Sequence, residues 1–125
     1  MPTTRDLNNR VTVTIALAPI SVTSNTTRAS SWIDTANARY LEFVHFGEIT
    51  DGTYTPSLQE SDDQSTITSV DSSRIIGGLT VLTAGNEVHN IGVQPTKRYV
   101  RLRSVSTSTS TGAHAVGAIA IVGNS

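Results

Sequence analysis

Three histidines are the side chains of this 125-residue chain best suited to metal binding or proton transfer. His45, His89 and His114 are far apart in the sequence, and none has another histidine two or four residues away, the spacing that presents two ligands on one side of a strand or helix. Strands can still bring distant residues together. Without a local ligand pair we predict no metal site, and we expect these histidines to be partly buried or to lie at an interface.

The sequence also contains no motif for nucleophilic catalysis or for phosphate binding. No serine stands in a Gly-x-Ser-x-Gly turn, and the chain has no cysteine that a histidine could activate. Gly77, Gly78 and Gly112 lie outside any glycine-rich phosphate-binding sequence, so turns explain them. The sequence therefore predicts a protein that is not an enzyme and has no catalytic residue and no cofactor.

Two clusters of charged residues suggest other roles. Glu60, Asp62 and Asp63 lack the spaced oxygen ligands of a calcium loop, so we predict a solvated hairpin tip or a subunit contact. A basic segment surrounds Tyr99, and such a strand can bind single-stranded nucleic acid by stacking and phosphate contacts. The net charge of −1 argues against nucleic acid as a partner and favours a protein interface. The predicted interface residues are Arg5, Asn9, Arg10, Tyr99, Arg101 and Arg103.

Membrane association is not expected either. The first ten residues are polar, without the apolar stretch of a signal peptide, and we expect the protein to be made and used without secretion. The longest apolar stretch, residues 113–122, has about half the length of a membrane helix and contains a histidine and a glycine. We interpret it as a β-strand.

The elements that must position these residues are strands. The chain is rich in Ser and Thr and poor in Leu, Glu, Lys and Met, a composition that favours strands over helices. In residues 10–18, Val11, Val13, Ile15 and Leu17 alternate with small or hydroxyl residues, which predicts a half-buried strand. Further strands are predicted at 31–34, 39–46, 53–59, 65–70, 87–93, 97–105 and 112–122.

Strand 53–59 has a clear inward side, because Tyr54, Pro56 and Leu58 alternate with polar residues. Strand 39–46 is apolar on both sides, which suits the interior of a sandwich or contact with a partner. Residues 71–86 fit either an irregular apolar loop or one more short strand, and Ser104–Thr111 is predicted to be a mobile hairpin loop with frayed strand ends.

About eight strands separated by turns predict an all-β fold, an antiparallel β-sandwich or jelly roll. The length suits a single domain, residues 11–125, preceded by an amino-terminal arm of residues 1–10 that extends onto a neighbouring subunit. With no cysteine, stability must come from packing or from assembly into a homo-oligomer.

Three segments carry a resemblance to a known family. They are Asp51-Gly-Thr-Tyr-Thr-Pro-Ser-Leu-Gln-Glu-Ser-Asp-Asp63, Pro95-Thr-Lys-Arg-Tyr-Val-Arg101 and Gly117-Ala-Ile-Ala-Ile-Val-Gly-Asn124, together with Asn9-Arg10-Val11. In these segments the chain resembles small virion structural proteins of tailed bacteriophages, of the head decoration or cement type. It departs from their pattern at Gln64, where glycine is common, and in the long Ser/Thr run before Gly112.

The resemblance implies a capsid decoration protein that binds the major capsid protein on the capsid exterior and is made in the cytoplasm of the host bacterium. A tail or connector component is the alternative within the virion. A carbohydrate-binding or host-adhesion module is the alternative of another class, and it would need exposed aromatic platforms. Trp32, Tyr40 and Tyr54 are the candidate platforms, and the alternation around Tyr54 predicts that this one is buried.

Overall fold

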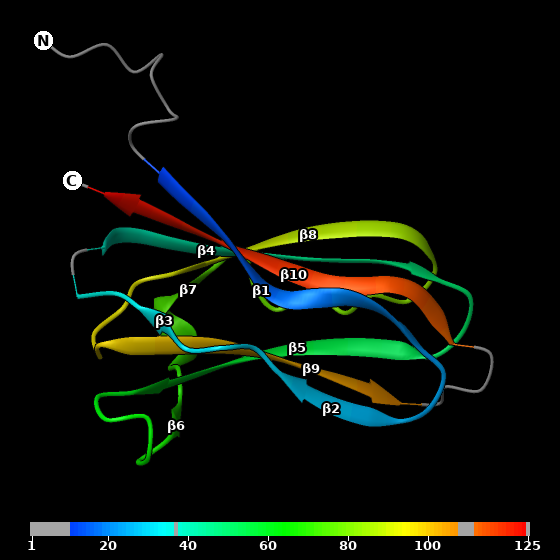
Figure 1. Ribbon diagram of the computed structural model, residues 1–125, viewed down its shortest axis with the longest axis horizontal. Coiled ribbons are helices and arrows are strands. Elements are labelled where there is room, and N and C mark those ends of the chain that lie inside the picture. The colour runs from blue at the N-terminus through cyan, green and yellow to red at the C-terminus, as the bar shows by residue number, and fades with distance from the viewer. Residues whose placement is uncertain (1–10, 37, 108–111, 125) are drawn as a thin grey trace, which may run out of the picture.

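The computed structural model describes residues 11–36, 38–107 and 112–124, which form two antiparallel sheets packed face to face (Figure 1). Sheet A contains, in spatial order, β1 (Val11–Val22), β10 (Ala113–Asn124), β4 (Ala38–Ile49), β8 (Gly85–Val93) and β7 (Ile75–Ile76). Sheet B contains β2 (Thr26–Ala29), β9 (Tyr99–Thr107), β5 (Thr53–Ser61) and β6 (Thr68–Ser69), with β3 (Ile33–Asp34) also paired to β9. The predicted antiparallel β-sandwich is confirmed. The predicted arm, with Arg5, Asn9 and Arg10, lies outside the described residues.

Strand β5 follows the alternation of its sequence. Tyr54, Pro56 and Leu58 are buried, as predicted. Proline fits within this strand because β6 pairs only with Gln59 and Glu60, so that β5 is an edge strand where Pro56 lies. The short strand β6 closes the predicted hairpin.

The prediction for Glu60 was wrong. Glu60 is the last inward-facing residue of β5 and is 3% exposed, whereas Asp62 and Asp63 in the following turn are exposed. Asp63 accepts hydrogen bonds from the backbone N–H groups of Ser65 and Thr66, both at 2.8 Å, and these bonds lower its pKa to about 2. Of the three acidic residues, only Asp62 and Asp63 therefore belong to the solvated tip.

Residues 71–86, which the sequence left open, contain both predicted kinds of structure. A single 3-10 turn, Ser72–Arg74, leads into the two-residue strand β7. Farther along, Leu82 forms an isolated antiparallel bridge with Tyr54 of β5 and is buried. This segment thus extends sheet A at one point and covers the edge of sheet B at another.

Strand β9 extends farther than predicted, into the Ser/Thr run. Ser104 and Ser106 are buried inward-facing residues of β9, and Ser106 Oγ accepts a hydrogen bond from the backbone N–H of Thr26 at 2.8 Å. This contact joins β9 to strand β2, which is not among the strands predicted from the sequence. Short hydroxyl side chains that bond to the neighbouring backbone allow this polar segment to form a regular strand. Residues 108–111 of the predicted loop lie outside the described residues.

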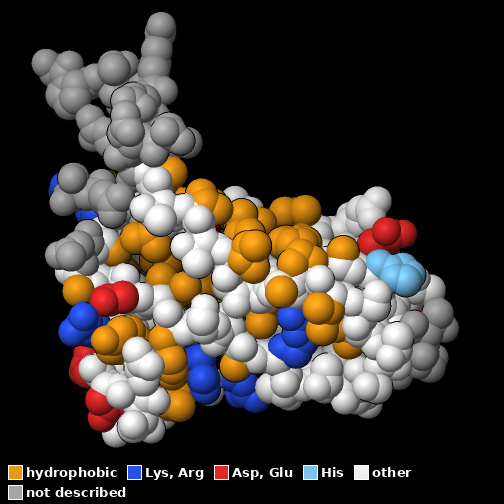
Figure 2. All heavy atoms as spheres, viewed as in Figure 1, with side chains coloured by type: hydrophobic (Ala, Val, Ile, Leu, Met, Phe, Trp, Pro, Cys, Tyr) orange, Lys and Arg blue, Asp and Glu red, His pale blue; other side chains and the backbone are white. Residues whose placement is uncertain are grey.

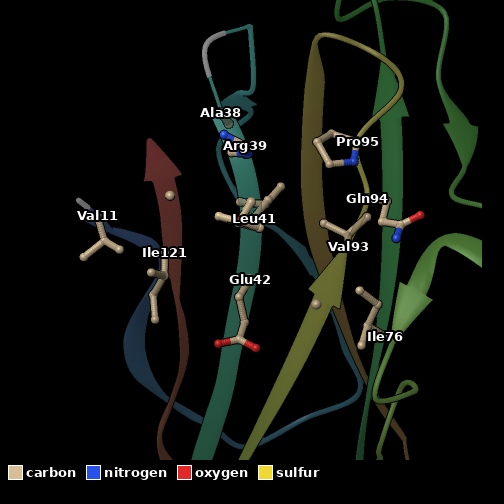
Figure 3. A pocket seen from close by; sticks show the side chains of 13 residues that line it. Val11, Ala38, Arg39, Leu41, Glu42, Ile76, Val93, Gln94, Pro95 and Ile121 are labelled. Carbon is tan, nitrogen blue, oxygen red and sulfur yellow. The ribbon is translucent and has the colours of Figure 1, made fainter. Parts of the chain in front are cut away.

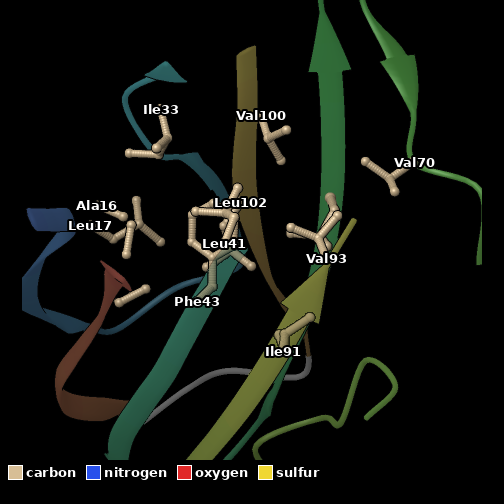
Figure 4. Packing of buried hydrophobic residues seen from close by; sticks show 13 residues of the cluster. Ala16, Leu17, Ile33, Leu41, Phe43, Val70, Ile91, Val93, Val100 and Leu102 are labelled. Atoms are coloured by element: carbon tan, nitrogen blue, oxygen red, sulfur yellow. The ribbon is translucent and has the colours of Figure 1, made fainter. Parts of the chain in front are cut away.

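The core fills the space between the sheets. Figure 4 shows Leu41 and Phe43 of β4 facing Val100 and Leu102 of β9, all of them at most 2% exposed. Burial of each such side chain contributes about 2 kcal/mol. A second buried cluster consists of Val22, Ile49, Tyr54, Leu82, Ala113 and Val116.

Strand β10 is an interior strand of sheet A, between β1 and β4. Pairing with β1 is irregular between Ile15 and Leu17 and again farther along, where β-bulges interrupt the register. Arg28 of β2 reaches across to this region, and its guanidinium donates to the carbonyl oxygens of Val116 at 2.8 Å and Ala18 at 2.7 Å. One arginine of sheet B therefore forms hydrogen bonds with two irregular strands of sheet A, β1 and β10.

Candidate functional site

The described part of the predicted interface lies on the outer side of sheet B. Tyr99, Arg101 and Arg103 alternate along β9 with buried residues and are partly exposed. The guanidinium carbon of Arg101 lies 4.4 Å from the ring centroid of Trp32, and its Nε donates to Gln59 Oε1 at 2.9 Å. Arg101 thus contacts two neighbours on the outer side of sheet B. Its cation–π contact with Trp32 could not be foreseen from the sequence.

Two of the three histidines come together. His45 of β4 and His89 of β8 are directly opposite in the register, so their side chains share the inward side of sheet A. His45 is fully buried, and its Nε2 lies 3.0 Å from Ser104 Oγ. Burial, followed by the nearby charges of His89 and Arg28, lowers the pKa of His45 to about 4. It is therefore neutral near pH 7.

The His45–Ser104 contact has the residue types of an activated nucleophile but not its setting. Both side chains are buried between the sheets, where a substrate has no access. His89 Nε2 instead lies 3.1 Å from Glu87 Oε1, while His114 contacts Ser21 at the surface. Within residues 11–36, 38–107 and 112–124, no three His, Cys, Asp or Glu side chains are placed to hold a metal ion.

The outer side of sheet A has a different character. Here the register aligns apolar residues from four neighbouring strands, and we call this surface the apolar face. Its residues are Val13, Ile15, Val44, Phe46, Val88, Ile119 and Ile121. Figure 2 shows hydrophobic side chains gathered along the top of the molecule in this view, where Figure 1 places β1, β10 and β8.

Cross-strand pairs make the apolar face continuous. Ile15 of β1 is opposite Ile119 of β10, which is opposite Val44 of β4. Phe46 of β4 is in turn opposite Val88 of β8. Val13, Ile15 and Val88 are 57%, 63% and 63% exposed. The prediction of a half-buried first strand is therefore wrong at Val13 and Ile15, which face away from the core.

At one end the apolar face deepens into a depression of about 560 Å³ (Figure 3). Gly92 and Gly123 contribute to its lining, and the two glycines permit close packing of neighbouring side chains. A Cβ atom added to Gly123 would lie 2.7 Å from the Tyr40 ring, and one added to Gly92 would lie 3.2 Å from Ile76. Figure 3 shows the carboxylate of Glu42 between Ile121 and Val93. The depression is thus largely apolar, with one carboxylate, Glu42, and one guanidinium, Arg39, in its lining.

The candidate aromatic platforms for a sugar do not form one surface. Tyr54 is fully buried, as predicted, Trp32 stacks on Arg101 at the outer side of sheet B, and Tyr40 lies on the outer side of sheet A. Trp32 and Tyr40, which lie on different sheets, cannot stack on one sugar together. The apolar face is therefore the better candidate site, and its chemistry suits the docking of another protein surface.

The sequence contained a signal for this surface. Strand 39–46 is apolar on both sides, and contact with a partner is one of the two explanations that this pattern predicts. What the sequence could not supply was the register that aligns Val44 with Ile119 and Ile15.

Comparison with known proteins added no relative, because no family model and no curated protein matches the chain. The described residues also contain no helix long and apolar enough to cross a membrane.

Proposed function

We propose that this protein is a virion structural protein of a tailed bacteriophage, a decoration protein that binds the major capsid protein on the capsid exterior. Binding, not catalysis, is its activity in this proposal. The observation that supports it best is the apolar face, a preformed apolar surface across four strands of a stable sheet. The resemblance of three sequence segments to phage head proteins is our reason for proposing a phage capsid as the binding partner.

The mechanism requires only modest affinity at each site. The apolar face belongs to regular strands whose opposite side is the core, so docking orders few groups and costs little conformational entropy. Many copies on a symmetric shell add up many small contacts, which stabilise the shell against internal pressure by avidity. A partner with apolar side chains suits the depression, whose lining is largely apolar and carries one residue of each charge, Glu42 and Arg39.

A tail or connector role is the second candidate within the virion, and it would use the same apolar face with a different partner. The carbohydrate-binding alternative is less well supported because Trp32 and Tyr40 lie on different sheets.

The test is co-sedimentation of the purified protein with capsids of the source phage that lack it. We expect saturable binding by the wild type and a loss of binding for Val88→Asp, which places a charge on the apolar face. Thr55→Asp is the matched control, because Thr55 is exposed on β5 at the opposite sheet. Absence of wild-type binding to such capsids, with binding to purified tails, would transfer the proposal to the tail.

A further inference from the structure

Four of the first five residues of β1 are exposed, two on each side of the strand. Val13 and Ile15 are exposed on the outer side, and Thr12 and Thr14 are exposed on the inner side, where sheet B does not cover them. Among the described residues β10 is the only strand beside β1. Within the part of the chain that the structure describes, the other edge of this strand therefore presents unpaired backbone N–H and C=O groups.

The other sheet edges carry features that discourage strand addition. Strands β6 and β7 have two residues each, and β2 has four residues with Arg28 among them. The part of β8 beyond β7 carries Glu87 and His89. By contrast, residues 11–27 contain no charged residue, and the first proline among them is Pro19. Long uncharged edge strands are sites of pairing between chains.

We propose that Val11–Ile15 of β1 pairs antiparallel with the same segment of a second copy of this chain, about a two-fold axis at Val13. The bulge between Ile15 and Leu17 ends the regular part of the strand, so the pairing segment is five residues long and Val13 is its centre. A second copy fits because the segment is self-complementary.

The pairing matches side chains of the same kind. With Val13 opposite Val13, the segment places Val11 opposite Ile15 on the outer side and Thr12 opposite Thr14 on the inner side. Apolar pairs and Thr–Thr pairs are both favourable across antiparallel strands, and no like charges meet. A two-fold axis perpendicular to the sheet keeps both apolar faces on the same side. The dimer therefore presents one apolar surface of doubled width.

Disulfide trapping tests the register directly, because the chain has no cysteine. Residues opposite each other in an antiparallel pair have Cα atoms about 4.5–5.5 Å apart, within the range of a disulfide. We expect Val13→Cys to form a dimer under mild oxidation that reducing agent reverses. Val88→Cys is the matched control, since Val88 is similarly exposed on β8. Equal cross-linking of both variants, or none at Val13→Cys, would overturn the proposal.

A charge exchange tests the same contact without a covalent bond. Val13→Lys and Val13→Glu should each weaken the dimer by about tenfold or more, because like charges meet at the axis. An equimolar mixture should restore a dimer containing both variants. A wild-type protein that stays monomeric in sedimentation equilibrium, or a mixture that does not associate, would overturn the proposal. These measurements need no capsid, so their failure is separate from a failure of capsid binding.

Discussion

Glu60 and Arg74 form a two-pronged ion pair at the end of the sandwich where β5 meets the 3-10 turn. Arg74 Nη1 donates to Glu60 Oε1 at 2.9 Å, and Nη2 donates to Oε2. The Glu60 side chain is only 4% exposed, and the hydrogen bond with Glu60 raises the pKa of Arg74. Arg74 Nη1 also donates to the carbonyl oxygen of Gln94 at 3.2 Å, so the pair joins β5 to the segment after β8.

Removal of Arg74 should therefore destabilise the fold. Arg74→Ala leaves the buried Glu60 carboxylate without its partner, and we expect the free energy of unfolding to fall by about 3 kcal/mol in urea titrations. Arg98→Ala is the matched control, because Arg98 forms a solvent-exposed pair with Asp34 at 3.0 Å and its loss should cost much less than the loss of Arg74. Equal losses in the two variants would contradict a buried role for the Glu60 pair.

His45 should make stability depend on pH between about 6.5 and 4. Above this window the histidine is neutral in both folded and unfolded chains and has no effect. As the pH falls from 6.5, the unfolded chain binds a proton that the folded protein, with a pKa of about 4, does not bind. Stability should decline through the window by an amount on the order of 3 kcal/mol, and thermal unfolding across this pH range measures it.

The variant His45→Gln should flatten that decline, because glutamine retains a hydrogen-bonding group for Ser104 but does not titrate. His114→Gln is the control, since it replaces a histidine that lies exposed at the surface. Hydrogen bonds with backbone N–H groups lower the pKa of Asp63 and of Glu87 to about 2, so the stability that both groups contribute is lost as the unfolded carboxyls protonate, below about pH 5. The decline between about pH 6.5 and 5 is therefore the part that reports on His45. A His45→Gln protein with the wild-type slope would refute the assignment.

Gly112 should tolerate no side chain. Its φ is +94°, and a Cβ atom there would lie 1.8 Å from the carbonyl oxygen of Val22. The backbone is fixed in place because Gly112 N–H donates to Asp51 Oδ1 at 2.6 Å. We expect Gly112→Ala to cost more than about 3 kcal/mol of unfolding free energy. Gly78→Ala measures the cost of the positive φ without a steric clash, since Gly78 has φ +77° with open space around it. This variant should lose about 1 kcal/mol of unfolding free energy.

Arg28 should stabilise the bulged region of sheet A. Arg28→Met keeps most of the aliphatic packing but leaves two carbonyl oxygens without a charged donor, and we expect a loss of about 2 kcal/mol in denaturant unfolding. Arg28→Lys should recover only part of it, because an ammonium group lacks the fork that reaches both carbonyls. Arg103→Met, on the outer side of β9, is the matched control and should be nearly neutral.

Local alternation predicted the strands well and their partners poorly. The pattern around Tyr54 and Leu58 already placed Glu60 on the inward side, yet its acidic type argued for solvent. The partner that makes its burial tolerable, Arg74, is fourteen residues away and beyond a turn. No local pattern indicates such a pair, because ion pairing depends on tertiary position.

The candidate site shows the same limit. The alternation of Val13 and Ile15 correctly indicated a strand with one apolar side, but alternation cannot say whether that side faces the core or the outside. The answer depends on the bulge after Ile15, which returns Leu17 to the inner side. The meeting of His45 and His89 likewise follows from register, which no spacing within one segment can supply.

The position of β10 between β1 and β4 has a consequence for synthesis of the protein. Strand β10 comes last along the described chain, yet it is the strand that joins β1 to β4. While the ribosome is still making residues 113–124, β1 has no partner within sheet A, and its uncharged residues remain open to other nascent chains. Folding must wait for this late insertion, and such long-range pairing takes about milliseconds to seconds. Expression yield should therefore respond to chaperones that shield β1 during this interval.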